Sequence, residues 1–280
     1  MEATLKMTAN NDFNNSHIDP NIGGRHKSAK LFVAVVGAHL LAYLLVWLTD
    51  TNQTLFYSLN HILSFLPNIF WQITTHFGET LSAIAILLLL VHKKPGIMLH
   101  LLVSGLVCFL LVYGLKQFLD ITRPHLVLAQ DSFNFIQTDK TSPARPSGHT
   151  ATGAFIAGSL FYLCRDRLGI CLLLVGGAFL IALSRIAIGV HWPLDIFLGG
   201  AIGWITGYLG YAWLTGKMRG YKGSLPQQTQ RQLALSVIGL VLGLLVVIPY
   251  PYLPATLLFK LTLAAALIWQ VYHLYKSRTV

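Results

Sequence analysis

The chain has 280 residues, of which 54% are hydrophobic and only 11% charged, and its formal net charge is +10. Soluble globular domains carry about 25% charged residues, so this composition excludes an ordinary soluble domain and favours a membrane protein with several spans. The basic residues occur in short clusters between apolar runs and not in one continuous stripe. This pattern argues against nucleic acid as a partner and favours membrane lipids with anionic headgroups.

Eight apolar stretches have the length of membrane-spanning helices, each of which needs about 20 apolar residues. A shorter apolar piece, residues 55–66, contains Asn60 and His61, so we expect it to lie at the membrane surface. The sequence therefore predicts an all-α, polytopic transmembrane helix bundle of about eight spans over residues 31–280. The approximate spans are residues 31–48, 70–91, 97–119, 149–164, 169–188, 194–214, 233–249 and 255–275.

The positions of the Lys and Arg residues predict the orientation of these spans. Most of the 20 basic residues fall on one side of the eight-span arrangement, together with both termini. Because cytoplasmic segments are enriched in Lys and Arg, both termini are predicted to be cytoplasmic in a bacterial inner membrane. Residues 1–30 are polar, rich in Asn and without a signal peptide, and we expect them to form a disordered tail. The exceptions face the periplasm or exterior: Lys116, Arg123, Lys140, Arg145 and Arg185.

Three glycines recur every four residues in the sixth predicted span: Gly199, Gly203 and Gly207. Such a stripe of small residues allows a neighbouring helix to approach closely. Glycine is also generally common in membrane helices. The sequence leaves both interpretations open.

Three polar clusters lie at the predicted outer ends of different spans. They cover residues 116–124, 145–149 and 184–195. Lys116, Arg123 and Arg185 are cations that could converge on one dianion, since guanidinium groups match phosphate oxygens in geometry. Ser147 and Gly148 precede a predicted helix, where backbone N–H groups and the helix dipole also favour an anion.

The third cluster contains the pair expected to carry out chemistry. His191 and Asp195 are four residues apart near the start of a predicted helix, so their side chains can meet on one face. The carboxylate would hold one ring nitrogen protonated and leave the other to attack phosphorus. His149, in the second cluster, would then protonate the leaving oxygen.

These clusters resemble the tripartite signature of the type 2 phosphatidic acid phosphatase family. The family's strings K-x6-R-P, P-S-G-H and S-R-x5-H-x3-D all occur here, in order and without a substitution, within residues 116–195. The resemblance covers roughly residues 76–212. Vanadium haloperoxidases share the same constellation, but they are soluble.

The resemblance implies a six-helix core, with the pair at 233–275 as an addition, and hydrolysis through a phosphohistidine without metal or other cofactor. His191 resembles the nucleophile, Asp195 its orienting carboxylate and His149 the general acid. The residues that resemble the phosphate cradle are Lys116, Arg123, Ser147, Gly148 and Arg185.

Three further residues are candidates for supporting positions around the site. Arg145 is compatible with binding a second phosphate or headgroup, or with anchoring its loop, and Ser184 precedes Arg185. Glu79 lies inside the second predicted span, where a carboxylate is by default a functional candidate that needs a partner. Lys116 or Arg185 could supply that partner; a structural ion pair or a protonated acid is the alternative.

The sequence therefore predicts a lipid phosphatase that removes the terminal phosphate of a lipid phosphate or diphosphate at the periplasmic face. Undecaprenyl diphosphate and phosphatidylglycerol phosphate are the favoured substrates. A lipid phosphotransferase or lipid A phosphatase would use the same residues, and a non-catalytic lipid-binding or transport protein is a third possibility. The motifs leave the oligomeric state open.

Overall fold

The computed structural model describes residues 22–84, 97–136, 142–218 and 253–276, together with isolated positions between 232 and 242. Within these ranges the secondary structure is helical, as the composition predicts. The helices are α1 (Ile22–Leu48), α2 (Asn52–Leu63), α3 (Asn68–His76), α5 (Ile97–Leu119), α6 (Pro124–Val127), the 3-10 turn η1 (Gln130–Ser132), α7 (Gly148–Leu163), α8 (Leu168–Ala187), α9 (Pro193–Met218) and α11 (Leu253–Lys276).

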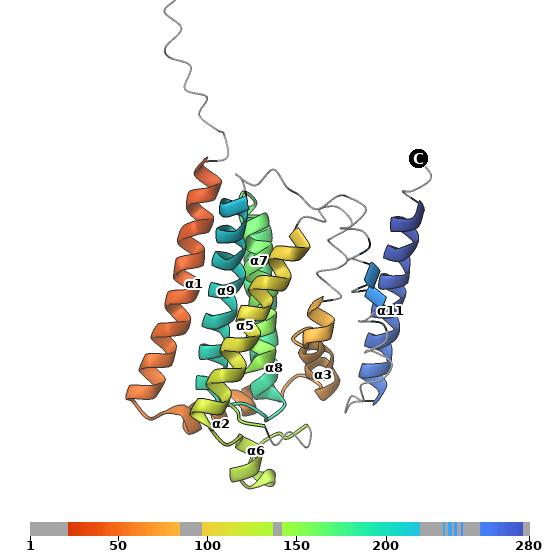
Figure 1. The fold of residues 1–280 in the computed structure, drawn as a ribbon. Coiled ribbons are helices and arrows are strands. Elements are labelled where there is room, and N and C mark those ends of the chain that lie inside the picture. Colours follow the sequence, from red (N-terminus) through yellow and green to blue (C-terminus); the bar gives the residue numbers. More distant parts are fainter. Residues whose placement is uncertain are drawn as a thin grey trace, which may run out of the picture.

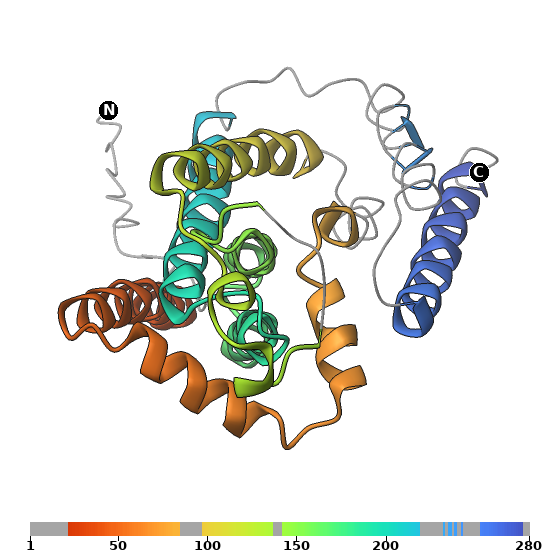
Figure 2. The same cartoon turned by 90° about the horizontal axis from the view of Figure 1, so that it is seen from below.

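Helices α7 and α9 form the centre of the bundle. α7 packs against α9, α8 and α5, while α1 and α5 pack against α9 (Figure 1). The view along the bundle in Figure 2 shows α1, α5 and α8 around this central pair, with α11 at the periphery, where it contacts α3. These helices account for five members of the expected six-helix core: α1, α5, α7, α8 and α9.

The glycine stripe on α9 explains why the central pair can pack so closely. A Cβ atom at Gly203 would lie 2.2 Å from the backbone oxygen of Ala151, and one at Gly207 would lie 2.3 Å from that of Phe155. Gly199 makes a similar approach to the start of α7. Real Cβ atoms do not tolerate such distances, so the stripe is confirmed as a helix-packing surface.

The second predicted span differs from the structure. Residues 70–91 were expected to form one helix, but α3 ends at His76 and a new helical segment begins at Thr80. The N–H groups of Phe77, Gly78 and Glu79 each donate to the carbonyl three residues earlier, which tightens the chain into a 3-10 turn. Residues 85–96 lie outside the described part of the chain.

Two other boundaries also differ from expectation. The first helix begins at Ile22, so residues 22–30 of the expected tail are helical, and residues 1–21 lie outside the described part. Of the expected C-terminal pair, the second helix is confirmed as α11, whereas residues 233–249 lie outside it apart from isolated positions.

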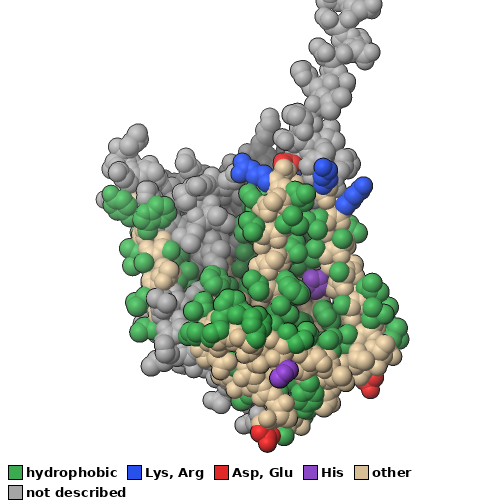
Figure 3. Space-filling view, turned by 180° about the vertical axis from the view of Figure 1, so that it is seen from behind, with side chains coloured by type: hydrophobic (Ala, Val, Ile, Leu, Met, Phe, Trp, Pro, Cys, Tyr) green, Lys and Arg blue, Asp and Glu red, His purple; other side chains and the backbone are tan. Residues whose placement is uncertain are grey.

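The surface of the bundle has the chemistry of a membrane-embedded protein. Three helical segments in the described part are long and apolar enough to cross a membrane: residues 29–48, 101–127 and 168–187. Large apolar side chains are exposed along α1 and α5, among them Leu41, Leu48, Leu106 and Phe109. Figure 3 shows apolar side chains over the flank of the bundle, while Lys and Arg side chains gather at one end. The total of eight spans stays a prediction.

Helix α2 lies across the opposite end of the bundle, as Figure 2 shows. It has 12 residues, too few to span a bilayer, which agrees with the expected position at the membrane surface. Its Phe56 and Leu63 side chains are buried against the bundle, whereas Ile62 is exposed. The helix therefore packs along the edge of this end of the bundle, where it contacts α8 and α9.

Candidate active site

All three polar clusters meet at the end of the bundle that α2 covers, where α5 and α8 end and where α7 and α9 begin. The elements that carry them are the last turn of α5 (Lys116), the residue before α6 (Arg123), the start of α7 (Ser147, Gly148, His149), the last turn of α8 (Arg185), the α8–α9 loop (His191) and the first turn of α9 (Asp195).

His191 lies between a carboxylate and a guanidinium group. Its Nδ1 is 3.2 Å from Oδ2 of Asp195, and its Nε2 is 3.2 Å from NH1 of Arg123. A guanidinium group only donates hydrogen bonds, so Nε2 must be the acceptor and Nδ1 must carry the proton. His191 is therefore the tautomer that is protonated on Nδ1, and its lone pair is on Nε2, the nitrogen that does not face Asp195.

The His191 ring is also kept neutral. Burial lowers the pKa of His191 well below its ordinary value, and the positive charges of Arg123, Arg185 and Lys116 lower it further. Only the neutral ring has a lone pair on Nε2. The same cations that could bind a phosphate thus keep the ring in its nucleophilic form.

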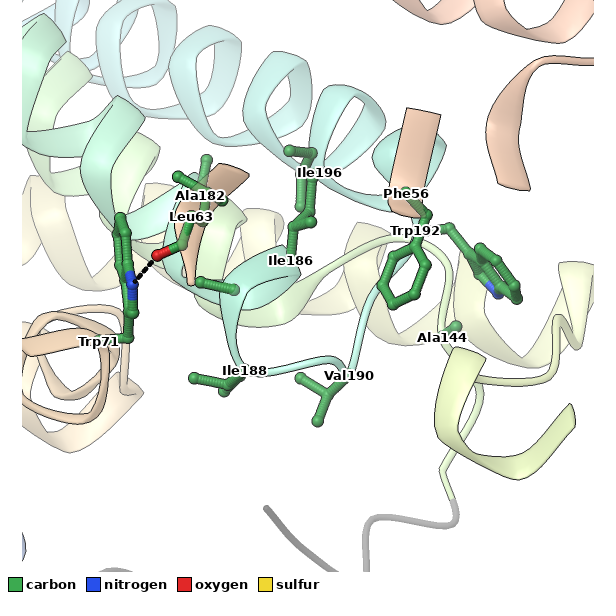
Figure 4. Close-up of a cluster of buried hydrophobic side chains, with 11 residues drawn as sticks. Phe56, Leu63, Trp71, Ala144, Ala182, Ile186, Ile188, Val190, Trp192 and Ile196 are labelled. Atoms are coloured by element: carbon green, nitrogen blue, oxygen red, sulfur yellow. Dashed lines mark hydrogen bonds between the residues drawn. The ribbon is translucent and has the colours of Figure 1, made fainter. Parts of the chain in front are cut away.

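The loop that carries His191 is shaped by a glycine and by a buried apolar cluster. Gly189 has a φ of +80°, which favours glycine. A Cβ atom there would also lie 2.6 Å from the ring of Phe133. Figure 4 shows the apolar cluster, to which the loop contributes Ile188, Val190 and Trp192, and in which Phe56 of α2 lies beside Trp192, with ring centroids 5.2 Å apart. This packing fixes the loop on both sides of His191.

The cations of the expected cradle are held by backbone oxygens. Lys116 Nζ donates to the carbonyls of Pro143 and Ala144, the latter at 3.2 Å. Arg123 donates through Nε to the carbonyl of Ser142 at 2.7 Å. These bonds tie the chain just before the second cluster to the end of α5. They also hold two positive charges close enough to His191 to act on its ring.

Arg185 is fixed from another side of the site. Its NH1 donates to the hydroxyl of Thr75, on α3, and its side chain is buried. Sequence reasoning did not identify Thr75, because α3 is remote from the motifs in sequence. The contact shows that α3 contributes to the site.

Ser147 forms the N-cap of α7 and links it to α9. Its side-chain oxygen accepts hydrogen bonds from the N–H and the hydroxyl of Thr150, and its own N–H donates to the backbone oxygen of Asp195 at 2.9 Å. The expectation that this N–H points to an anion is therefore wrong, because Asp195 already accepts it. The cap sets the position of the residues that follow, Gly148 and His149.

Arg145 and Ser184, the two other supporting candidates, make different contacts. Arg145 Nε donates to Oδ1 of Asp195 at 3.0 Å, and both side chains are buried, so Arg145 anchors the carboxylate that orients His191. Ser184 donates to the carbonyl of Ile181 within its own helix at 2.6 Å. Its hydroxyl thus serves α8 and not the cradle.

Glu79 contacts two histidines that were not among the partners considered from the sequence. Its Oε1 lies 3.5 Å from Nε2 of His149 and 3.9 Å from Nδ1 of His76. The turn between α3 and the next helical segment brings Glu79 to the start of α7.

Asn60 is a supporting residue that sequence reasoning did not assign to the site. Its Nδ2 donates to the carbonyls of Ile186 at 2.8 Å and Ala187 at 3.3 Å, and its Oδ1 accepts from the N–H of Asn134 at 2.7 Å. The last carbonyls of a helix need such partners. A signal was present, because Asn60 lies on the same helical face as Phe56 and Leu63, where an apolar side chain is expected.

No group of three or more His, Cys, Asp or Glu side chains is placed to hold a metal ion within the described ranges. The described site contains four cations, two histidines and two carboxylates: Lys116, Arg123, Arg145, Arg185, His149, His191, Glu79 and Asp195. Such a set can bind a phosphate dianion, supply a nucleophile and supply a proton.

Comparison with known proteins agrees with this geometry. Residues 97–219 match the model of the PAP2 superfamily. The chain is 34% identical over 119 residues to a lipid A 1-phosphatase of Porphyromonas gingivalis, an alignment that covers 40% of this chain and 26% of that protein. The chain thus spans about a quarter of the length of this relative.

Two solved structures are similar. The crystal structure of a transmembrane PAP2 type phosphatidylglycerolphosphate phosphatase from Bacillus subtilis matches with a TM-score of 0.51 and 19% identity, over 68% of this chain and 98% of that chain. Aquifex aeolicus LpxE matches with a TM-score of 0.47 and 29% identity, over 57% of this chain and 94% of that one. The first of these supports the fold.

Proposed function

We propose that this membrane-embedded protein, which belongs to the PAP2 superfamily through residues 97–219, is a lipid phosphatase that acts through a phosphorylated histidine. The observation that carries the proposal is the setting of His191, whose Nδ1 faces Asp195 and whose Nε2 accepts a hydrogen bond from Arg123. A histidine held in one tautomer, neutral and surrounded by cations, is suited to attack a bound phosphate.

In the first step, the Nε2 lone pair of His191 attacks phosphorus. A P–N bond forms, and the bond between phosphorus and the leaving oxygen breaks. His149 gives its proton to that oxygen, so the lipid leaves as an alcohol, or as a lipid monophosphate when the substrate is a diphosphate. The positive charge that develops on the His191 ring is stabilised by Asp195.

In the second step, water attacks the phosphohistidine. His149, now neutral, accepts a proton from the water as the P–N bond breaks, and inorganic phosphate leaves. Lys116, Arg123 and Arg185 supply positive charge around the phosphoryl oxygens throughout, and the N–H of Gly148 completes the cradle. Arg123 would exchange its hydrogen bond to Nε2 for one to a phosphate oxygen as the nucleophile reacts.

The substrate is proposed to be a lipid phosphate or diphosphate. A lipid-anchored substrate is concentrated where this site lies, at the ends of membrane-spanning helices. Undecaprenyl diphosphate and phosphatidylglycerol phosphate are the first substrates to test, and the relative from P. gingivalis adds lipid A 1-phosphate to the panel. A labelled donor incubated with acceptor lipids distinguishes hydrolysis from phosphoryl transfer to a second lipid.

The decisive test replaces His191 with Ala in the full-length, detergent-solubilised protein. Phosphate release from every substrate of the panel should fall to background, because the nucleophile is gone. In the unaltered protein, brief incubation with labelled substrate should trap an acid-labile, alkali-stable phosphoryl group. His61, an exposed histidine of α2, provides the matched control, and His61→Ala should retain full activity. Release that persists in His191→Ala would refute the mechanism.

A further inference from the structure

The contact between Glu79 and His149 places a carboxylate beside the imidazole that is proposed as the general acid. Glu79 Oε1 is 3.5 Å from His149 Nε2, and both side chains are about one-sixth exposed, with relative accessibilities of 16% and 17%. A carboxylate beside an imidazole orients the ring and stabilises its protonated form. Protonated His149 is the form that a general acid needs.

The chain is built to make this contact. Glu79 follows Gly78 in the 3-10 turn after α3, and a Cβ atom at Gly78 would lie 2.9 Å from the backbone oxygen of His149 and 3.0 Å from its Cβ. It would also lie 2.7 Å from Cγ2 of Ile181 on α8. Because the residue is glycine, the turn lies directly against the start of α7, and the next side chain reaches the imidazole.

The charged groups around this pair lie on two sides. His76, on α3, is 3.9 Å from the same carboxylate oxygen. On the other side are the charges that act on the neighbouring His191, namely those of Arg123, Arg185, Lys116 and His149 itself. A carboxylate next to the His149 ring favours the protonated form of that ring.

We propose that Glu79 is the positioning residue of the general acid. Its carboxylate accepts a hydrogen bond from the Nε2–H of His149, and this contact leaves the Nδ1–H of the ring directed to the leaving oxygen. This inference rests on the proposed phosphatase function. In the first step the Nδ1 proton passes to the oxygen that leaves phosphorus, and the Nε2 proton stays between His149 and Glu79. In the second step Nδ1 recovers a proton from the attacking water.

This assignment predicts which substrates depend on Glu79. An alkyl or sugar oxygen leaves as a strongly basic alkoxide unless it is protonated, whereas a nitrophenolate is weakly basic and leaves without a proton. The pair therefore fits phosphate monoesters of alcohols or sugars as the substrate class that most needs it. Loss of the carboxylate should slow these substrates more than activated ones.

The test uses two synthetic lipid phosphates with the same tail, one an alkyl phosphate and one a nitrophenyl phosphate, with full-length protein in detergent. In Glu79→Gln, kcat/KM for the alkyl ester should fall by about 100-fold, the lower end of what a general acid contributes. The nitrophenyl ester should lose much less. Glu79→Asp should recover part of the alkyl activity, and the alkaline limb of the pH profile should move to lower pH in Glu79→Gln.

Two further variants test whether Glu79 acts through His149. His149→Gln should show the same selective loss, and adding Glu79→Gln to it should cause no further loss, because coupled residues are not additive. Equal losses on both esters in Glu79→Gln, or unchanged alkyl hydrolysis, would overturn the role of Glu79. These outcomes are separate from the proposed function, which is tested by phosphate release from the lipid panel and by its loss in His191→Ala.

Discussion

The Asp195 carboxylate contacts three groups at once. Oδ2 lies 3.2 Å from His191 Nδ1 and accepts the Trp192 N–H at 2.9 Å, while Oδ1 accepts from Arg145 at 3.0 Å. A buried carboxylate is costly unless it is paired and hydrogen-bonded. Arg145 therefore holds the Asp195 carboxylate in place and opposes the cost of burying its charge. The spacing of four residues predicted the contact with His191, but Arg145 is 50 residues away in sequence, and only the fold brings it to the same carboxylate.

The cations around His191 give the pH dependence of the reaction a definite direction. Burial is the largest cause that lowers the pKa of His191, and Arg123 is the next. His191 should thus remain neutral below its ordinary pKa of about 6.5, and the acid limb of kcat/KM should lie below that pH. In Arg123→Gln the pKa of His191 rises, so this limb should move to higher pH, together with a large loss of rate.

The comparison is made with one substrate on both proteins, so that protonation of the substrate itself cancels. Arg167, an exposed arginine at the other end of the bundle, provides the control, and Arg167→Gln should reproduce the profile of the unaltered protein. Acid limbs that coincide in Arg123→Gln and the unaltered protein would contradict this electrostatic role.

At the scale of elements, the site depends on the register of α7 against α9. The N–H of Ser147, at the start of α7, donates to the backbone oxygen of Asp195, at the start of α9. Further along, Gly203 and Gly207 allow α9 to contact the α7 backbone. The helix pair thereby helps to set the separation of His149 and His191, which act on opposite sides of one phosphate in the proposed mechanism.

A methyl group in this interface should disturb both stability and activity. Gly203→Ala places a Cβ where the Ala151 oxygen is 2.2 Å away, so the helices must separate. We expect a loss of about 1–3 kcal/mol, typical of overpacking, and reduced phosphate release, measured by thermal inactivation and by activity in detergent. Gly37→Ala on α1 is the matched control, since nothing lies within 4 Å of its Cβ, and it should be neutral or slightly stabilising. Equal behaviour of the two variants would argue against the register model.

The sequence predicted most helices well and failed at one particular turn. The expected 97–119 coincides with α5, and the expected 149–164 and 169–188 are each one residue from α7 and α8. Long apolar runs bounded by charged or proline-containing segments are strong signals. The break at residues 77–79 lies inside an apolar run, and its cause is the contact of Gly78 with α7 and α8, a tertiary effect that apolar length does not reveal. The position of Glu79 was missed for the same reason.

At the scale of the molecule, the two ends of the bundle differ in charge. Exposed Lys27, Lys30 and Arg167 lie at the end where α1 begins, whereas exposed Asp50, Asp120 and Asp131 lie at the site end (Figure 3). Three basic residues of the site end, Arg123, Arg145 and Arg185, are buried. Because they face inward, these arginines can lie on the side that the positive-inside rule disfavours.

This asymmetry leads to a prediction about the orientation in a bacterial inner membrane. The basic end should be cytoplasmic and the site end periplasmic. A reporter that is active only in the periplasm should be silent when fused after Val280 and active when inserted at Asp131, an exposed residue of η1 at the site end. A reporter that is active only in the cytoplasm, fused at the same positions, should give the reverse pattern.

Two other outcomes would contradict this orientation. His191 lies in the loop between α8 and α9, at the same end of the bundle as Asp131. Inverted signals at both positions would therefore place His191 on the cytoplasmic side and require a substrate from the inner leaflet. A periplasmic signal at Val280 together with one at Asp131 would instead mean that the chain crosses the membrane an even number of times between η1 and its end, contrary to the five spans predicted there.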